Sequence, residues 1–213
     1  PEEAVLLTWP DRERTLWAFP KDLDLLAVGH ALLEWCEPGQ RPVLREKDSR
    51  AFHMEPAPMA SLPEPAPFPP MDGETLLSAM KDFLAASGRW DDTGCFHRMA
   101  VFHRPTGRFI LRVEDIGRHN CIDRVSGWCL LNQVNPKECA LFVSARTTAS
   151  LVTKIIRAGF PLVISRSAVT NTGIAMAREH KVSLVGFTRV ERFTLFTDER
   201  KHLAVPETVG GGS

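Results

Sequence analysis

The order of apolar runs and helical patterns in the second half of the chain most restricts what it can fold into. Continuous apolar runs alternate with amphipathic helical spacing at residues 139–144, 148–158, 161–165, 170–180, 182–187 and 193–196. Strands that are apolar on both faces need cover on both faces, which is typical of parallel strands in an α/β sheet. We therefore expect an α/β fold in which a mixed sheet, with parallel pairs inside, carries helices on both faces.

The first half of the chain has a less regular order. Strand-like and helix-like patterns are expected at residues 4–7, 15–19, 22–37, 72–87, 99–103, 109–113 and 120–133. The first three of these elements would form a small N-terminal α+β lobe. The pair at 99–103 and 109–113 is joined through Pro105 and Gly107, which is typical of a hairpin.

Prolines separate these two halves. Seven of them fall close together at positions 56, 58, 63, 65, 67, 69 and 70. Because proline lacks an N–H and has a fixed φ, we predict that residues 40–70 form an extended linker and neither a helix nor a central strand. The chain then divides into an N-terminal lobe with its linker at 1–70, a core at 71–205 and a tail at 206–213.

The composition excludes several classes of protein. No apolar run is long enough to span a bilayer, so we expect no membrane partner. Five cysteines, an odd number without paired spacing, argue against a disulfide framework and for a reducing, cytoplasmic compartment. The formal net charge of zero and the scattered aromatic residues argue against nucleic-acid binding.

The charge is unevenly distributed along the chain. Residues 1–97 hold 9 Lys+Arg against 17 Asp+Glu, whereas residues 98–213 hold 17 Lys+Arg against 9 Asp+Glu, and 13 of those 17 bases are Arg. Arginine suits bidentate recognition of phosphate and stacking on planar rings. The second half therefore suits a phosphate-bearing ligand, and the alternative is that the acidic half packs against the basic half.

Hydroxyl and guanidinium groups follow three of the predicted strands. Because parallel strands end at one edge of a sheet, these side chains would meet there and form an anion site. The alternative is that the serines and threonines only cap helices, and the two roles are compatible. The candidate residues are Ser144, Arg146, Ser165, Ser167, Thr170, Thr188, Arg189 and Arg192.

Residues 114–124 crowd polar groups where a predicted strand turns into a helix. Gly117 marks the turn, and Asn120 is expected to cap the helix. We expect Arg118 and His119 to contact a phosphate-bearing ligand. Asp115 or Asp123 would pair with Arg118 or accept hydrogen bonds from a base such as guanine. The alternative is a charged surface turn held by salt bridges.

The same residues carry a resemblance to a known family. The segment Glu114-Asp115-Ile116-Gly117-Arg118-His119-Asn120-Cys121-Ile122-Asp123-Arg124 resembles the E-D-V-G-R-H-N-A-V-D-K signature of the formate dehydrogenase accessory protein family, FdhD/NarQ. Further segments that are similar to family motifs follow the family's order, at residues 25–34, 93–97, 144–146, 165–170 and 186–189. The resemblance covers most of the chain and is weakest over 40–70.

This resemblance implies a cytidine-deaminase-like α/β core, a small N-terminal lobe and a homodimer. It implies a sulfur carrier that passes sulfur, as a persulfide, from a cysteine desulfurase to the molybdenum cofactor. That cofactor, in its molybdopterin guanine dinucleotide form, is cargo for formate dehydrogenase or another molybdoenzyme. The family's cofactor-binding segment corresponds here to Phe187, Thr188, Arg189, Val190, Glu191 and Arg192.

One departure concerns the sulfur-carrying thiol. The family has a C-x-x-C before its T-G-G-x-H motif, and the corresponding residues here, roughly 51–70, contain no cysteine. Carrying sulfane sulfur requires a thiolate. Cys121 is the candidate carrier, because it lies near a helix N-terminus and close to His119, where its pKa would be lowered. The alternative is that Cys121 is a small residue that fills a tight site.

Two other functions remain open from the sequence. The missing C-x-x-C favours a scaffold or chaperone that binds the cofactor for a molybdoenzyme without moving sulfur. A zinc-dependent, deaminase-like hydrolase would use Cys95, His97, His119 and Cys121 as a tetrahedral N/S site. The zinc deaminases pair an H-x-E with a later P-C-x-x-C, and no P-C-x-x-C occurs in the sequence after its H-x-E at residues 53–55, which argues against the hydrolase.

Overall fold

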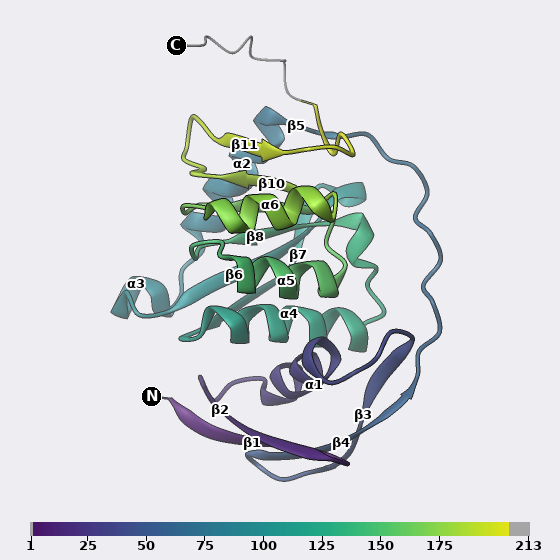
Figure 1. The fold of residues 1–213 in the computed structure, drawn as a ribbon. Coiled ribbons are helices and arrows are strands. Elements are labelled where there is room, and N and C mark those ends of the chain that lie inside the picture. Colours follow the sequence, from purple (N-terminus) through teal and green to yellow (C-terminus); the bar gives the residue numbers. More distant parts are fainter. Residues whose placement is uncertain (1, 205–213) are drawn as a thin grey trace.

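The computed structural model describes residues 2–204, apart from the side chains of Asp91 and Asp92. It consists of an N-terminal lobe of residues 2–58, called the N-lobe below, a linker of residues 59–70 and a larger core (Figure 1). The predicted tail at 206–213 lies outside the described residues. No helix within residues 2–204 combines the length and the apolar character that crossing a membrane requires.

The N-lobe is a four-stranded sheet with one helix against it. The strand order is β2-β1-β4-β3, in which β1 and β4 are parallel and the outer pairs are antiparallel. Its apolar core forms between the sheet and the buried face of the helix, which includes Leu26 and Ala27. The elements are β1 (Glu3–Trp9), β2 (Arg12–Ala18), α1 (Leu23–Glu34), β3 (Gln40–Lys47) and β4 (Ala51–Pro58).

The prediction of a linker over 40–70 was therefore wrong for residues 40–58, which form β3 and β4. The position of the prolines explains why β4 can be a central strand. It pairs with β1 only over residues 51–53, so Pro56 lies where β3 is its single neighbour. There Pro56 faces Pro42, and neither residue has an N–H to leave unpaired.

Residues 59–70 do form an extended linker, which runs along the side of the core (Figure 1). Asn135 Nδ2 donates to the main-chain oxygen of Pro63 at 2.9 Å, and the Arg104 guanidinium lies 4.3 Å from the ring centroid of Phe68. The linker leads into β5 (Met71–Asp72), which pairs in parallel with β12 (Leu203–Ala204). This small sheet, which joins the two ends of the core, was not predicted.

The core contains a six-stranded sheet of order β11-β10-β9-β8-β6-β7. β8, β9 and β10 are parallel, and the remaining pairs are antiparallel, so the predicted mixed α/β sheet is confirmed. The elements are α2 (Gly73–Ala85), α3 (Arg89–Thr93), β6 (His97–His103), β7 (Arg108–Asp115), α4 (Arg118–Leu131), β8 (Cys139–Val143), α5 (Ala149–Ala158), β9 (Leu162–Ser165), α6 (Asn171–Glu179), β10 (Ser183–Gly186) and β11 (Thr194–Thr197).

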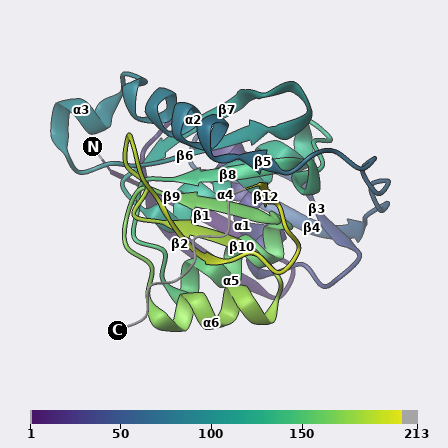
Figure 2. The ribbon, with the colours of Figure 1, turned by 90° about the horizontal axis from the view of Figure 1, so that it is seen from above.

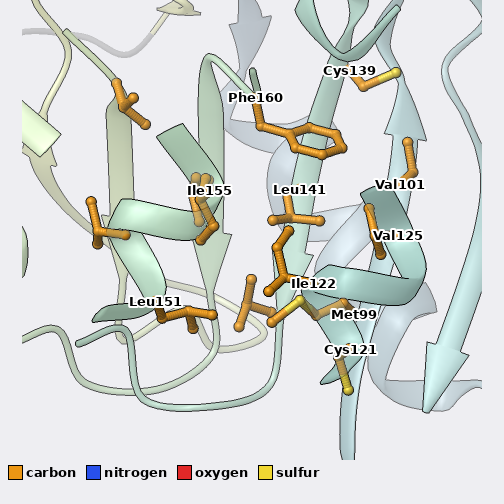
Figure 3. Close-up of a cluster of buried hydrophobic side chains, with 14 of the residues drawn as sticks. Met99, Val101, Cys121, Ile122, Val125, Cys139, Leu141, Leu151, Ile155 and Phe160 are labelled. Atoms are coloured by element: carbon orange, nitrogen blue, oxygen red, sulfur yellow. The ribbon is translucent and has the colours of Figure 1, made fainter. Parts of the chain in front are cut away.

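Helices cover both faces of this sheet, as the continuous apolar strands require. α4, α5 and α6 lie on one face and α2 on the other (Figure 2). The alternation of side chains along β8 fills both layers, because Leu141 belongs to the first apolar cluster and Phe142 to the second. Figure 3 shows Leu141 beside Ile122 of α4 and Ile155 of α5 in the first cluster.

The N-lobe is attached to the core where α1 crosses α4 (Figure 1). Two glycines let the helix backbones approach closely. A Cβ on Gly29 would lie 1.6 Å from the main-chain oxygen of Asp123, and a Cβ on Gly127 would lie 2.1 Å from that of Leu25. The crossing therefore depends on the absence of side chains at these two positions.

Candidate functional site

The ends of five strands meet at one edge of the six-stranded sheet, on the left of Figure 1. β6 runs antiparallel to both β7 and β8, so its amino end lies between their carboxyl ends. His97 pairs with Asp115, and Met99 pairs with Val143. β9 and β10 continue in parallel and end at the same edge. We call this edge the rim; it comprises residues 95–98, 115–119, 144–148, 165–170 and 187–192.

Hydrogen bonds from main-chain N–H groups hold neighbouring rim segments together. Ser144 N donates to Arg98 O at 3.0 Å, and Arg98 N donates to Ser144 Oγ at 2.8 Å. Thr147 N donates to Ala168 O at 3.0 Å, and Thr188 N donates to Ser165 O at 3.1 Å. The structure therefore brings together the segments whose strand ends were predicted to meet. The roles of their side chains as ligand contacts stay predictions.

Several of the predicted hydroxyl groups already have partners in the protein. Ser165 Oγ is buried and donates to Ala145 O at 3.1 Å, and it accepts from Ser167 N at 3.0 Å. Thr170 Oγ1 accepts from Gly173 N at 3.2 Å and caps α6. The capping alternative thus holds for Thr170, while Ser144 and Ser165 position the rim segments.

Four polar atoms on the rim are buried and have no hydrogen-bond partner among the described residues. They are Nδ1 of His97, Nε of Arg118, Oγ1 of Thr147 and Oγ1 of Thr188. An unpaired buried polar atom costs about 1–3 kcal/mol of stability, so such atoms are rare unless a ligand or water satisfies them. Thr147 was not among the predicted site residues, and His97 was considered only as a metal ligand. His97 also ends the segment 93–97 that resembles the family's T-G-G-x-H motif.

The two rim histidines are held in the neutral form. Burial lowers the pKa of His97, the nearby Arg118 guanidinium lowers it further, and Asp115 opposes the change. Burial also lowers the pKa of His119, with Arg118 and then Lys154 adding to the effect. Both imidazoles are therefore neutral at pH 7, where one nitrogen can donate and the other can accept. His119 Nε2 lies 3.2 Å from Ser150 Oγ.

The predicted arginines follow different strands along the rim. Arg118 is half-buried at the start of α4, whereas Arg146, Arg189 and Arg192 are exposed. Arg189 Nη1 donates to the main-chain oxygens of Arg166 and Thr188. Exposed guanidinium groups beside buried unpaired donors are a suitable set for a large anion.

The segment before β11 forms an exposed loop. Phe187 has φ 50°, in the left-handed region that is uncommon for a residue with a bulky side chain, and the residue is 44% exposed. Its N–H donates to Ser167 O at 3.0 Å, which fixes the turn. Val190 is also exposed, at 58%, and Glu191 lies beside it on the surface.

Asp115 was expected to pair with Arg118 or to bind a ligand, and the structure corrects this. Its carboxylate is fully buried and bonds to Arg124, with Oδ2 accepting from Nε at 2.9 Å and from Nη2 at 2.7 Å. Oδ1 accepts from Gly117 N at 3.0 Å and from Asn120 Nδ2 at 2.9 Å. Protein donors therefore use both oxygens, which leaves Asp115 a structural role.

Asn120 does not cap the helix, because α4 begins after Gly117 and Asn120 lies in its first turn. Its Nδ2 donates to the main-chain oxygen of Trp17 at 2.8 Å, across the boundary between the N-lobe and the core. The side chain that was predicted to start the helix instead helps to attach the N-lobe.

Asp123 is likewise used inside the protein. Its carboxylate accepts from Lys154 Nζ at 2.7 and 2.9 Å and lies 3.1 Å from His30 Nδ1. Lys154 also forms an ion pair with Glu34 of α1 at 3.1 Å. The buried charges join the N-lobe to α4 and α5. Ion pairs therefore account for the two aspartates, as the alternative had it, but in the interior and not in a surface turn.

Cys121 does not fulfil the prediction of a reactive carrier. The side chain is buried, its Sγ donates to the main-chain oxygen of His97 at 3.4 Å, and burial raises its pKa far above the usual range of a thiol. The expected proximity to a helix N-terminus is outweighed by desolvation of the thiolate. Cys121 is thus the small residue in a tight site that the alternative described.

The sequence matches a family model and several curated proteins. The family model described as the FdhD/NarQ family matches residues 47–203. Protein FdhD of Methanocaldococcus jannaschii is 39% identical over 111 residues, which are 52% of this chain and 48% of that protein. Sulfur carrier protein FdhD of Bacillus subtilis is 36% identical over 124 residues, which are 58% of this chain and 47% of that protein. The chain spans about half the length of these curated relatives.

A solved structure shows the same fold over nearly the whole chain. It is that of a provisionally named formate dehydrogenase accessory protein from Desulfotalea psychrophila. The match has a TM-score of 0.77 with 23% identity, and it covers 94% of this chain and 88% of that one. The family model, the curated relatives and the shared fold lead to one conclusion: this chain belongs to the FdhD/NarQ family.

Proposed function

We propose that this chain is a sulfur-carrier-type accessory protein for the maturation of formate dehydrogenase, and that it binds the molybdenum cofactor in its molybdopterin guanine dinucleotide form at the rim. The cofactor would be bound as cargo. Membership of the FdhD/NarQ family and relatives named sulfur carrier protein FdhD support the accessory role.

The observation that carries the cofactor proposal is the set of unpaired buried polar atoms on the rim. Arg118 Nε, Thr147 Oγ1 and Thr188 Oγ1 can donate to phosphate oxygens, and neutral His97 can donate or accept. α4 begins within a rim segment, α5 and α6 begin directly after one, and helix N-termini favour anions. A pyrophosphate-bearing dinucleotide matches this donor set.

The exposed loop before β11 offers a surface for the base of such a nucleotide. The Phe187 ring is a flat apolar face on which a purine can stack, and Glu191 can accept from guanine N–H groups. Asp115 and Asp123 are no longer candidates for the base, since both are buried and paired. We therefore assign recognition of the base, which was predicted for Asp115 or Asp123, to Phe187 and Glu191.

The sulfur-transfer step has less support than cofactor binding. Residues 51–70 contain no cysteine, and the linker part of this segment packs against Asn135 and Arg104. Arg104 follows the carboxyl end of β6, which is the end of that strand opposite the rim. A thiol for sulfur transfer must come from another part of the chain or from a partner.

The lack of a cysteine in residues 51–70 favours a second candidate function. In this function the chain is a scaffold or chaperone that binds the cofactor for a molybdoenzyme and moves no sulfur. The burial of Cys121 supports this second function. The zinc hydrolase gains no support, because no group of three His, Cys, Asp or Glu side chains among those that the structure describes is arranged to hold a metal ion. Cys121 and His119 are engaged with His97 O and Ser150 instead.

The proposal includes partners. Formate dehydrogenase or another molybdoenzyme would receive the cofactor, and a cysteine desulfurase would supply any sulfur. We also propose that the protein acts as a homodimer, which rests on the family resemblance alone, and that it does so in the cytoplasm, which rests on its five cysteines without paired spacing.

Calorimetric titration with GDP, as a stand-in for the nucleotide half of the cofactor, tests the site. We expect binding that weakens about tenfold or more in Arg118→Ala and in Arg189→Ala, since each removes a charge-assisted contact. Arg45→Ala is the matched control, because Arg45 pairs with Glu55 on the surface of the N-lobe. Absence of binding at millimolar GDP would refute the cofactor proposal.

A further inference from the structure

β7 is an edge strand of the six-stranded sheet, because it lies at one end of the strand order. With α2 it forms the margin of the molecule at the top of Figure 2. The main-chain groups of an antiparallel strand point alternately to its two sides. On β6, Arg98 directs both its N–H and its C=O to Ser144 after β8, so the next residue, Met99, directs its main-chain groups to β7.

Two residues of β7 therefore direct main-chain groups away from the sheet. Arg112 lies opposite Ala100 and Glu114 lies opposite Arg98, and both of these β6 residues face β8. The N–H and C=O groups of Arg112 and Glu114 point to the open side of β7, and no main-chain group of the described residues pairs with them there. An edge of this kind is a template for pairing with a further strand.

A cavity of about 700 Å³ lies directly against this open edge. Leu111 and Val113 belong to the face of the sheet that α4 covers, whereas Arg112 pairs with Asp82 of α2 on the other face. Side chains from both faces of β7 line the one cavity, so it lies beyond the edge of the strand and not over one face. The residues of β7 that line it, 111–114, span about 13 Å at the usual rise of an extended chain.

The walls of this cavity come from two parts of the molecule. The end of α2 and the turn after it form one wall, which includes Phe83, and the segment that leads into α1 forms the other, which includes Phe19 and Leu25. The Arg89 guanidinium reaches from the first wall to the second, 4.5 Å from the centroid of the Phe19 ring. The cavity is thus a slot beside β7 with apolar side chains in both walls, a shape that suits one extended segment.

The lining of the slot carries an excess of positive charge. Its described carboxylates are Asp22 and Glu114, and its cationic side chains are Lys21, Arg89, Arg98, Arg112 and Arg124. Arg98 and Arg124 are buried in ion pairs inside the protein, whereas Lys21 and Arg89 are exposed. The charge that complements the slot is therefore negative.

We propose that the open edge of β7 binds an extended, acidic segment of a partner protein as an added strand. The main chain of that segment pairs with the N–H and C=O groups of Arg112 and Glu114, and its carboxylates face Lys21 and Arg89. A peptide main chain offers both donors and acceptors at the spacing of a strand, whereas a phosphate or a nucleic-acid backbone offers acceptors alone.

This inference goes beyond the proposed function and does not depend on a cofactor at the rim. The slot and the rim adjoin, because β7 ends at Asp115, where the rim segment 115–119 begins. A partner held in the slot therefore lies next to the rim.

A labelled peptide tests the slot with the full chain. The probe is a fluorescein-labelled, acetylated eight-residue peptide in which Glu and Thr alternate, and fluorescence anisotropy measures its binding. The matched control has the same sequence with N-methyl groups on its four central residues, which keeps the charge and removes the main-chain donors. We expect saturable binding of the probe, and binding of the N-methylated peptide that is weaker by about tenfold or more.

A pair of variants at one residue separates the main-chain contact from the charge. Arg112→Pro removes the outward N–H and leaves the hydrogen bonds to β6 intact, since Arg112 does not donate to β6. Arg112→Thr removes the same charge and keeps the N–H. We expect Arg112→Pro to bind the probe about tenfold or more weakly than Arg112→Thr. Circular dichroism checks that both variants fold, and the N-methylated peptide decides the question if Arg112→Pro does not.

Hydrogen exchange locates the bound segment. The amides of Arg112 and Glu114 should exchange more slowly when the probe is added, because both would then donate to its main chain. Unchanged exchange at these two amides would overturn the proposal. So would the absence of saturable binding at millimolar probe, equal affinity for the N-methylated peptide, or tighter binding of a peptide in which Lys replaces Glu.

Discussion

Arg124 donates two hydrogen bonds to Oδ2 of Asp115, from Nε at 2.9 Å and from Nη2 at 2.7 Å, and both side chains are almost completely shielded from solvent. The same guanidinium donates to the main-chain oxygens of Phe19, Lys21 and Asp22 in the N-lobe. One buried ion pair therefore joins the strand and helix at the rim to the segment that leads into α1.

Removing one partner of this pair should strongly destabilise the protein. We expect Arg124→Leu to lower the free energy of unfolding by about 3–5 kcal/mol, because it leaves the Asp115 carboxylate buried without its cation. Urea unfolding followed by circular dichroism measures this. Arg112→Ala, which breaks an exposed pair with Asp82, should change stability by only about 0–1 kcal/mol. Equal effects of the two changes would contradict this role of the buried pair.

Gly127→Ala should destabilise the protein even though alanine favours helices. Helix propensity alone would raise stability by roughly 1 kcal/mol. The new methyl group would instead collide with Leu25 O, 2.1 Å from the Cβ position, and force α1 away from α4. We expect a net loss of about 1–3 kcal/mol in the free energy of unfolding. A gain in thermal stability would show that the crossing adjusts freely.

Removing an unpaired threonine hydroxyl of the rim should preserve or raise the stability of the protein but weaken GDP binding. We expect Thr188→Val to leave the free energy of unfolding unchanged or to raise it by up to about 1–3 kcal/mol, because it removes a buried hydroxyl without a partner. The same change should weaken GDP binding. Thr170→Val is the contrasting control, since it removes a helix cap and should cost about 1 kcal/mol. Unaltered GDP affinity in Thr188→Val would remove this hydroxyl from the site.

The stability of the protein should fall as the pH is lowered from neutral into the acidic range. Burial lowers the pKa values of His97, His119 and His202 in the folded state, whereas an unfolded histidine titrates near 6.5. Below about pH 6.5 the unfolded chain therefore binds protons that the folded chain does not, which favours unfolding. Urea unfolding between pH 8 and pH 5 checks this, and His119→Gln should reduce the slope.

One thiol of five should react in the native protein. Ellman's reagent should modify Cys95 quickly and the four buried cysteines only after addition of denaturant. A native count well above one would show that the core opens more readily than its packing indicates. Mass mapping of the modified peptide identifies the reactive residue.

The core could be predicted well from the sequence because its elements are long and apolar and follow one another regularly. The strands around Leu141, Ile164 and Leu184 carry uninterrupted apolar runs, and Gly159 marks the end of α5 with φ 81°. The N-lobe strands β3 and β4 were missed because prolines 42, 56 and 58 argue locally against a sheet. Only the pairing of Pro42 with Pro56 removes that objection, and pairing between distant residues is not visible in a sequence.

The candidate site was predicted at the level of segments and not of side chains. The strand ends at Ser144, Ser165 and Thr188 meet as expected. The two aspartates of the signature segment were assigned to a ligand because a sequence does not show burial or partners. Asp115 pairs with Arg124 of the same segment, whereas Asp123 pairs with Lys154 from another helix. Cys121 was chosen as the carrier because its sequence neighbours suggested a lowered pKa, whereas its burial depends on the packing of α4 against the sheet.

The linker has a consequence for how the molecule tolerates a break in its chain. Residues 59–70 span the gap between β4 of the N-lobe and β5 of the core, but the two parts are held together by the crossing of α1 over α4 and by the buried charges around Asp123 and Lys154. A nick within these residues would leave that contact intact. Two separately expressed pieces, one that ends before the prolines of the linker and one that begins after them, should reassemble into one complex.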